Sequence, residues 1–235
     1  MRNRWVFLSL LLYIQCSVLF AYEGDVHKKI NEEATNASQI DTILKNQLGL
    51  YEGLETKLNG FKDVYLDGKK IEFVWQWIGY GGKTEDFGKH EGIKSPLALF
   101  DIQEVMSTRA HNHFHDPLKN WSDSGLSNII LNKIYHDEYG RDSVSSIIWG
   151  LNPGQQDFQM NTTGDWSWGK AKENYYIYLT GRDLNGDLAA ENEDKRIAHF
   201  ADCFRALGQV MHLLEDMSVP LHTRNDAHIL PWTYI

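Results

Sequence analysis

The longest regular pattern in the chain covers residues 191–217 and predicts one long helix. Apolar residues recur in it three and four positions apart, which places them on a single helix face. Pro220 follows soon after and prevents the helix from continuing, because proline lacks the backbone N–H that a helix interior needs. The apolar side of this helix consists of Ile197, Phe200, Ala201, Phe204, Leu207, Gly208, Met211 and Leu214.

Helical periodicity also dominates the rest of the chain. Within residues 61–71, Asp67-Gly68 indicates a hairpin-like turn between short apolar runs, while residues 71–78 fit either a strand or a helix. The chain has 235 residues, of which 42% are hydrophobic, so it can bury a large core. We therefore expect an all-α fold, a single multi-helix domain. Further helices are predicted over residues 26–34, 40–50, 97–110, 126–135, 143–151 and 166–179.

The end of the long helix carries the most specific chemical signal, the segment HLLEDMSVPLH at residues 212–222. On a helix, His212 and Asp216 lie on one face with their Cβ atoms about 5–6 Å apart, so both can bind one metal ion. His222 follows just past the break at Pro220, where the chain can turn back. Imidazole and carboxylate groups together form a donor set typical of zinc sites.

Other potential metal ligands lie far from this helix in the sequence. His113 belongs to the segment HNHFHDP at residues 111–117, where three histidines fall within five positions. Asp86 ends the glycine-containing segment GGKTED at residues 81–86, and His27 lies five residues after Tyr22. Taken alone, each of these residues would more often have an ordinary core or surface role than bind a metal. Their joint occurrence with the 212–222 segment favours a metal cluster.

Together these residues resemble the zinc-dependent phospholipase C family, which shares its fold with the single-strand-specific zinc nucleases. The resemblance rests on the His-x3-Asp-x5-His spacing of residues 212–222, on HFHDP at residues 113–117, on Glu85-Asp86 and on His27. It extends from about residue 22 to the end of the chain. The family often has Tyr at the position of His115.

The resemblance implies a cluster of up to three zinc ions. Asp216 would bridge the first ion to a second, which His27 and the amino and carbonyl groups of Tyr22 would also hold. Tyr22 stands where the family typically has Trp, and ligation by the backbone does not need the indole. His222 would begin the third site. The implied ligands of the first ion are Asp86, His113, His212 and Asp216.

The implied activity is that of a secreted zinc metallohydrolase that cleaves phosphodiester bonds, most of all phospholipids, through a zinc-activated water. Asp216 would serve catalysis as the bridge between two ions. Asp86 is either a ligand or a general base that orients the water, and the sequence does not separate these roles. The family completes its third site with a His-x3-Glu pair beyond the counterpart of His222, and no such pair follows here. We therefore expect a chain incomplete at its C-terminal end, or an incomplete third site.

The first 21 residues have the features of an export signal. Arg2 and Arg4 precede an uncharged, mostly apolar run that ends at Ala21. We expect residues 1–21 to be a cleaved signal peptide and residues 22–235 to form the zinc-dependent phospholipase C-like domain, secreted or periplasmic, with no transmembrane helix. Cys203 would be the one cysteine left after cleavage, so the fold depends on its core or on metal.

Three other functions remain open at this point. The same zinc cluster could serve a single-strand nuclease or nucleotidase, or the chain could be an exported metal-binding domain without turnover. The histidines could also come together by accident in a helical domain. The net charge of −9 gives no support to a stable nucleic-acid partner, because polyanion binding needs basic surface. We therefore favour a phospholipid substrate, with contact to a membrane surface as an option.

Overall fold

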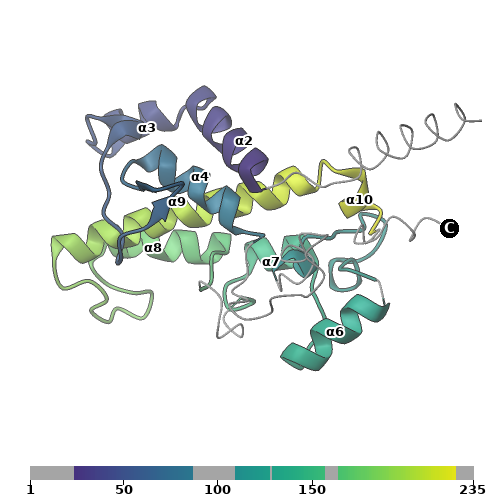
Figure 1. Cartoon of the computed structure of the whole chain (residues 1–235). Coiled ribbons are helices and arrows are strands. Elements are labelled where there is room, and N and C mark those ends of the chain that lie inside the picture. Colours follow the sequence, from purple (N-terminus) through teal and green to yellow (C-terminus); the bar gives the residue numbers. More distant parts are fainter. Residues whose placement is uncertain (1–23, 87–108, 128, 157–163, 226–235) are drawn as a thin grey trace, which may run out of the picture.

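The computed structural model describes residues 24–86, 109–127, 129–156 and 164–225, and helices dominate it (Figure 1). The expected all-α class is confirmed, since helices make up most of the described residues and the described strands form a single two-stranded sheet. The family-specific version of the fold stays a prediction. In chain order the elements are α2 (Gly24–Ala37), α3 (Ile40–Gln47), η1 (Gly53–Glu55), β1 (Tyr65–Leu66), β2 (Lys69–Lys70), α4 (Val74–Thr84), η2 (Ala110–Asn112), η3 (Trp121–Asp123), α6 (Ile129–Tyr139), α7 (Ser146–Leu151), α8 (Trp168–Thr180), α9 (Glu193–Asp216) and α10 (Pro220–Thr223).

Helix α9 is the long helix predicted from the sequence, and the other long helices pack around it. It begins after Asn192, whose side chain accepts a hydrogen bond from the backbone N–H of Lys195. Helices α4 and α8 pack against α9, and α2 lies against α4 on the side away from α8 (Figure 1). Val219 then precedes α10, which starts at Pro220 because proline suits the first position of a helix.

The main apolar core lies where α3, α4, α8 and α9 meet. Trp77 of α4 is 1% exposed, and its indole N–H donates to the carbonyl of Leu58 at 3.0 Å. Phe200 of α9 stacks on Tyr178 of α8 with ring centroids 4.0 Å apart. Ring pairs of this kind add specific geometry to the burial of apolar area. The core therefore holds α4 and α8 on α9.

Glycines allow α4 and α9 to approach each other at backbone distance. A Cβ added to Gly208 would lie 2.0 Å from the carbonyl oxygen of Ile78, and one added to Gly81 would lie 2.1 Å from that of Arg205. The side chain of Asn31 in α2 donates to the carbonyls of Ile78 and Gly208, at 3.3 and 2.9 Å. The amide of Asn31 therefore links α2 to both α4 and α9, close to the point where these two helices leave no room for side chains between them.

The structure resolves the two ambiguous segments near α4. Tyr65 pairs with Lys70, and both Asp67 (φ 52°) and Gly68 (φ 75°) adopt positive φ, as the predicted two-residue hairpin turn requires. The 71–78 segment enters a helix at Val74. The side-chain oxygen of Gln76 accepts from the backbone N–H of the residue before that helix, at 3.1 Å. This hydrogen bond fixes the start of α4.

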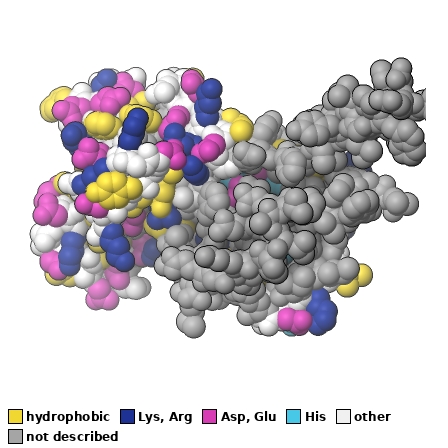
Figure 2. All heavy atoms as spheres, in the orientation of Figure 1, with side chains coloured by type: hydrophobic (Ala, Val, Ile, Leu, Met, Phe, Trp, Pro, Cys, Tyr) yellow, Lys and Arg dark blue, Asp and Glu magenta, His cyan; other side chains and the backbone are white. Residues whose placement is uncertain are grey.

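The helices predicted over 26–34, 40–50, 126–135, 143–151 and 166–179 are confirmed as α2, α3, α6, α7 and α8, with small shifts of their ends. The helix predicted over 97–110 lies almost wholly outside the described residues, as do the signal predicted over 1–21 and the last ten residues. In the described ranges, no helix is long and apolar enough to span a bilayer. Basic and acidic side chains are interspersed over the described part of the face in Figure 2.

We predict that Gly208→Ala destabilises the protein, although alanine normally favours a helix over glycine by about 1 kcal/mol. The added methyl meets the carbonyl oxygen of Ile78, and forced overpacking typically costs about 1–3 kcal/mol. Urea unfolding of both proteins measures the difference in the free energy of unfolding. The sign of that difference is the test, and a stabilised variant would contradict the close crossing of α4 and α9.

Candidate metal centre

The predicted ligands in the described ranges converge on one buried cluster. The helix α9 supplies two of them one turn apart, α2 and α10 supply one each, and two come from segments that follow α4 and η2. All six are at most 8% exposed, so the cluster is shielded from bulk water. Tyr22, the predicted backbone ligand, lies outside the described residues. The six are His27, Asp86, His113, His212, Asp216 and His222.

One oxygen of Asp216 faces the first half of the cluster. Its Oδ2 lies 2.8 Å from Nδ1 of His113 and 3.2 Å from Nε2 of His212. Asp86 faces the same two nitrogens, with its Oδ1 3.4 Å from each. Two carboxylates and two imidazoles thus point at one another. These are the four ligands that the resemblance implies for the first ion.

The other oxygen of Asp216 faces a second pair of imidazoles. Its Oδ1 lies 3.2 Å from Nδ1 of His222 and 3.5 Å from Nε2 of His27. The ring of His27 stacks on that of His212 at 3.6 Å between centroids, so the two halves are in direct contact. His222 and His27 therefore face the same oxygen of Asp216, whereas the resemblance places His222 in a third site.

Two of the histidines are oriented by acceptors on their far side. Nδ1 of His212 lies 2.7 Å from the carbonyl oxygen of Gly82, which can only accept, so that nitrogen carries the proton. Nδ1 of His27 lies 2.6 Å from Oε2 of Glu215. In both rings Nε2 is left facing Asp216. Histidines that bind metals almost always donate their other N–H to such an acceptor.

The donor atoms of the cluster fit a metal ion. Although imidazole nitrogens lie close by, no hydrogen bond of good geometry reaches either oxygen of Asp216 or Nε2 of His212 among the described residues. Buried polar atoms normally have such a partner. The cluster contains two groups of three residues, and within each group the donor atoms all lie within 4.8 Å of one another. His212 belongs to both groups. One imidazole nitrogen serves one ion, whereas a carboxylate has two oxygens. Asp216 is therefore the residue suited to join two ions. The groups are His27, His212 and Asp216, and Asp86, His113 and His212.

Without a metal, the histidines and carboxylates of the cluster stabilise each other's charged forms. Burial alone raises the pKa of Asp216, but the imidazoles of His212 and His222 outweigh it and hold that pKa well below its usual range. Burial alone lowers the pKa of His113, but the nearby carboxylates of Asp216 and Glu85 raise it to about 9. The pKa of His212 is likewise raised by Asp86 and Asp216, against the effect of burial. A metal ion would therefore have to compete with protons for these groups.

The other histidines of the 111–117 segment point elsewhere. The ring of His111 lies 5.3 Å from that of Tyr135, and Nδ1 of His115 lies 3.0 Å from the hydroxyl of Ser124. Sequence reasoning did not assign roles to Glu215 and Glu85, which both lie against histidines of the cluster. Each precedes a cluster aspartate directly in the sequence, and that adjacency is the signal that was available.

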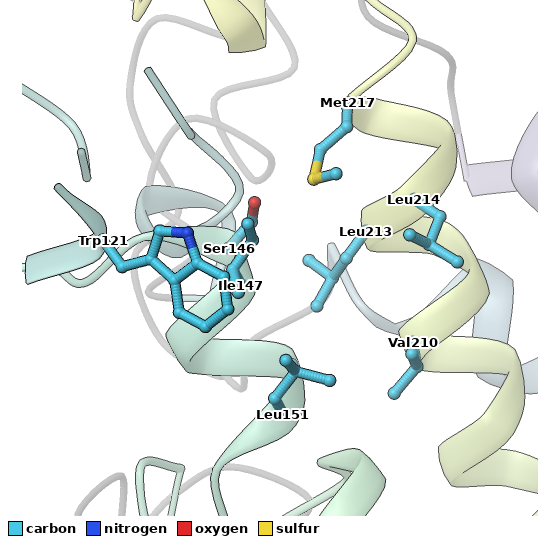
Figure 3. Close-up of a pocket in the computed structure, with 9 residues that line it drawn as sticks. Trp121, Ser146, Ile147, Leu151, Val210, Leu213, Leu214 and Met217 are labelled. Atoms are coloured by element: carbon cyan, nitrogen blue, oxygen red, sulfur yellow. The ribbon is translucent and has the colours of Figure 1, made fainter. Parts of the chain in front are cut away.

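An apolar groove lies between α7 and α9 (Figure 3). Its volume is about 270 Å³, and no residue of the metal cluster lines it. Leu213 and Met217, which directly follow His212 and Asp216 in the sequence, form part of its wall. Trp121 and Leu214 are 57% and 60% exposed along it. The lining residues are Trp121, Ser146, Ile147, Gly150, Leu151, Val210, Leu213, Leu214 and Met217.

The chain matches no protein-family model, no curated protein and no solved structure. The arrangement of the cluster is therefore the basis for any functional conclusion.

We predict that zinc binding releases protons and strengthens as the pH rises. The pKa of His113 is raised from 6.5 to about 9, so the ring is protonated at neutral pH and must lose its proton to bind an ion. For each proton displaced, the affinity should rise about tenfold per pH unit up to that pKa. Calorimetric titration with zinc between pH 6 and 8, in buffers of different ionisation enthalpy, measures this. A heat of binding independent of the buffer would contradict it.

Proposed function

We propose that the protein is a zinc-dependent phosphodiester hydrolase of the phospholipase C type. The observation that carries the proposal is the position of Asp216, whose two oxygens face different pairs of imidazoles in a buried cluster. A carboxylate in this position can hold two divalent ions side by side. Two-metal sites are a recurrent arrangement in enzymes that cleave phosphodiesters.

Zinc is the metal that best suits these ligands. Imidazole and carboxylate donors suit zinc, whereas calcium and magnesium prefer sites built from oxygen atoms alone. When bound, zinc would neutralise a phosphate group and lower the pKa of a water so that it attacks phosphorus. The chain itself would hold the ions through His27, His113, His212 and Asp216, in a pocket that excludes bulk water.

Asp86 is the residue best placed to act on the attacking water. At 8% exposure it is the most accessible member of the cluster. Burial raises its pKa, but the imidazoles of His212 and His113 outweigh this and lower it, so the carboxylate is ionised. It can therefore bind an ion or accept a proton. Both roles use the same oxygen, which lies between His113 and His212.

The apolar groove favours a lipid over a nucleic acid as the substrate. The groove and the cluster share α9, because Leu213 and Met217 line the groove and directly follow His212 and Asp216 of the cluster. Such a surface suits the hydrocarbon part of a phospholipid. The net charge of −9 works against a polyanionic substrate. A nuclease with the same ions is the second candidate, and it rests on the resemblance of the ligand pattern.

An assay of two substrates with the zinc-loaded protein tests the proposal. Phosphatidylcholine in mixed micelles should yield choline phosphate, and single-stranded DNA should yield little free nucleotide. Nucleotide release with intact lipid would support the nuclease instead. Bound zinc with no turnover of lipid, DNA or a chromogenic phosphodiester would contradict both enzymes and support a metal-binding domain.

We predict that Asp216→Asn lowers the zinc content by at least one ion and abolishes lipid hydrolysis. The amide keeps one oxygen, and its nitrogen cannot bind an ion, so the two halves of the cluster lose their link. Metal analysis after dialysis and choline phosphate release are the measurements. Asp187→Asn, in an exposed loop between α8 and α9, is the matched control and should leave both unchanged. Full zinc content and a normal rate in Asp216→Asn would remove the bridging role.

A further inference from the structure

A buried ion pair, Glu85 with Arg109, lies next to His113 of the cluster. Glu85 and Arg109 are both fully buried, and Nη2 of Arg109 lies 2.6 Å from Oε2 of Glu85. Taking two charges out of water is costly, and well-packed apolar residues often stabilise a fold at least as well. The pair therefore calls for an explanation other than stability.

The pair is held in place by hydrogen bonds from three parts of the fold. The indole N–H of Trp149 in α7 donates to Oε1 of Glu85 at 2.8 Å. Nη2 of Arg109 also donates to the side-chain oxygens of Gln156 and Gln209, at 2.7 and 2.9 Å. Gln209 lies one turn before His212 on α9. The carboxylate of Glu85 is thus fixed relative to the helix that supplies the central ligands.

The fixed carboxylate faces the far side of His113. Oε1 of Glu85 lies 3.6 Å from Nε2 of His113, which is slightly longer than a hydrogen bond. Among the described residues, Nε2 of His113 has no hydrogen-bond partner. The opposite nitrogen, Nδ1, faces Asp216 and Asp86 in the first half of the cluster. Catalytic hydrogen bonds are often long before a ligand binds and shorten afterwards.

We infer that Glu85 is a positioning residue, whose carboxylate accepts the Nε2 proton of His113 and so directs Nδ1 of that ring to the metal. This inference rests on the metal centre of the proposed function. It gives His113 the same arrangement as His27 with Glu215 and His212 with Gly82, in which one nitrogen donates away from the cluster. Arg109 and Trp149 hold the acceptor rather than touching the ion.

Zinc affinity, measured by competition with a chromogenic chelator, tests this role without any need for turnover. Glu85→Gln keeps the size of the side chain and removes the charged acceptor. We expect its zinc affinity to fall by about 10- to 100-fold, the usual effect of removing such a partner. The cobalt-substituted variant should also show altered visible absorption, which reports ligand geometry. An unchanged affinity and an unchanged spectrum would overturn the inference.

A double variant separates positioning from loss of stability, since Glu85→Gln leaves Arg109 buried without its partner. Adding Arg109→Met removes that charge and should restore the resistance to urea. The zinc affinity should stay low if Glu85 positions His113. Recovery of the affinity together with the stability would overturn the inference.

Asp165→Asn is the matched control for the loss of a buried carboxylate. Asp165 is 8% exposed and accepts hydrogen bonds from the backbone of Gly154 and Ser167, with no histidine among these partners. The control should lose stability and keep its zinc affinity. Wild-type protein without zinc affinity would overturn both the metal centre and this inference. Wild-type protein that binds zinc without hydrolysing lipid would contradict the proposed function alone, and the comparison of affinities would still decide the role of Glu85.

Discussion

The contact between α4 and α9 at backbone distance is the constraint on which the rest of the structure depends. Gly81 and Gly208 leave no side chain between the two helices, and this brings the carbonyl of Gly82 within 2.7 Å of His212. The same contact places Asp86, just past the end of α4, against the imidazoles of the cluster. The close crossing of two helices thus sets the orientation of His212, a central residue of the cluster.

The helices, and the convergence of His212 and Asp216 on one cluster, could be predicted because both depend on spacing along the chain. The period of apolar residues defined α9, and the His-x3-Asp spacing placed two potential metal-binding side chains one turn apart on it. The start of α4 could not be predicted, because an aromatic run fits a strand as well as a helix. There the side chain of Gln76 decides, by accepting hydrogen bonds from the backbone just before the helix.

The residues that orient the histidines of the cluster could not be predicted from the sequence. Glu215 meets His27 across 188 positions, and Arg109 meets Gln209 across 100. Nothing in the spacing of one sequence shows such contacts, which depend on how helices cross. Glu85 and Glu215 each come directly before a cluster aspartate. Neighbours of a ligand are therefore sensible places to look for the groups that orient other ligands.

The position of His222 on the short helix α10 has a consequence for the proposed metal centre. His222 lies on this four-residue helix, and its carbonyl accepts a hydrogen bond from the backbone N–H of His115 at 3.1 Å. His212 and Asp216 belong instead to the 24-residue helix α9, which packs against α4 and α8. Segments with few contacts open locally at low free-energy cost. In the proposed centre, His222 is therefore the ligand that we expect to move most readily.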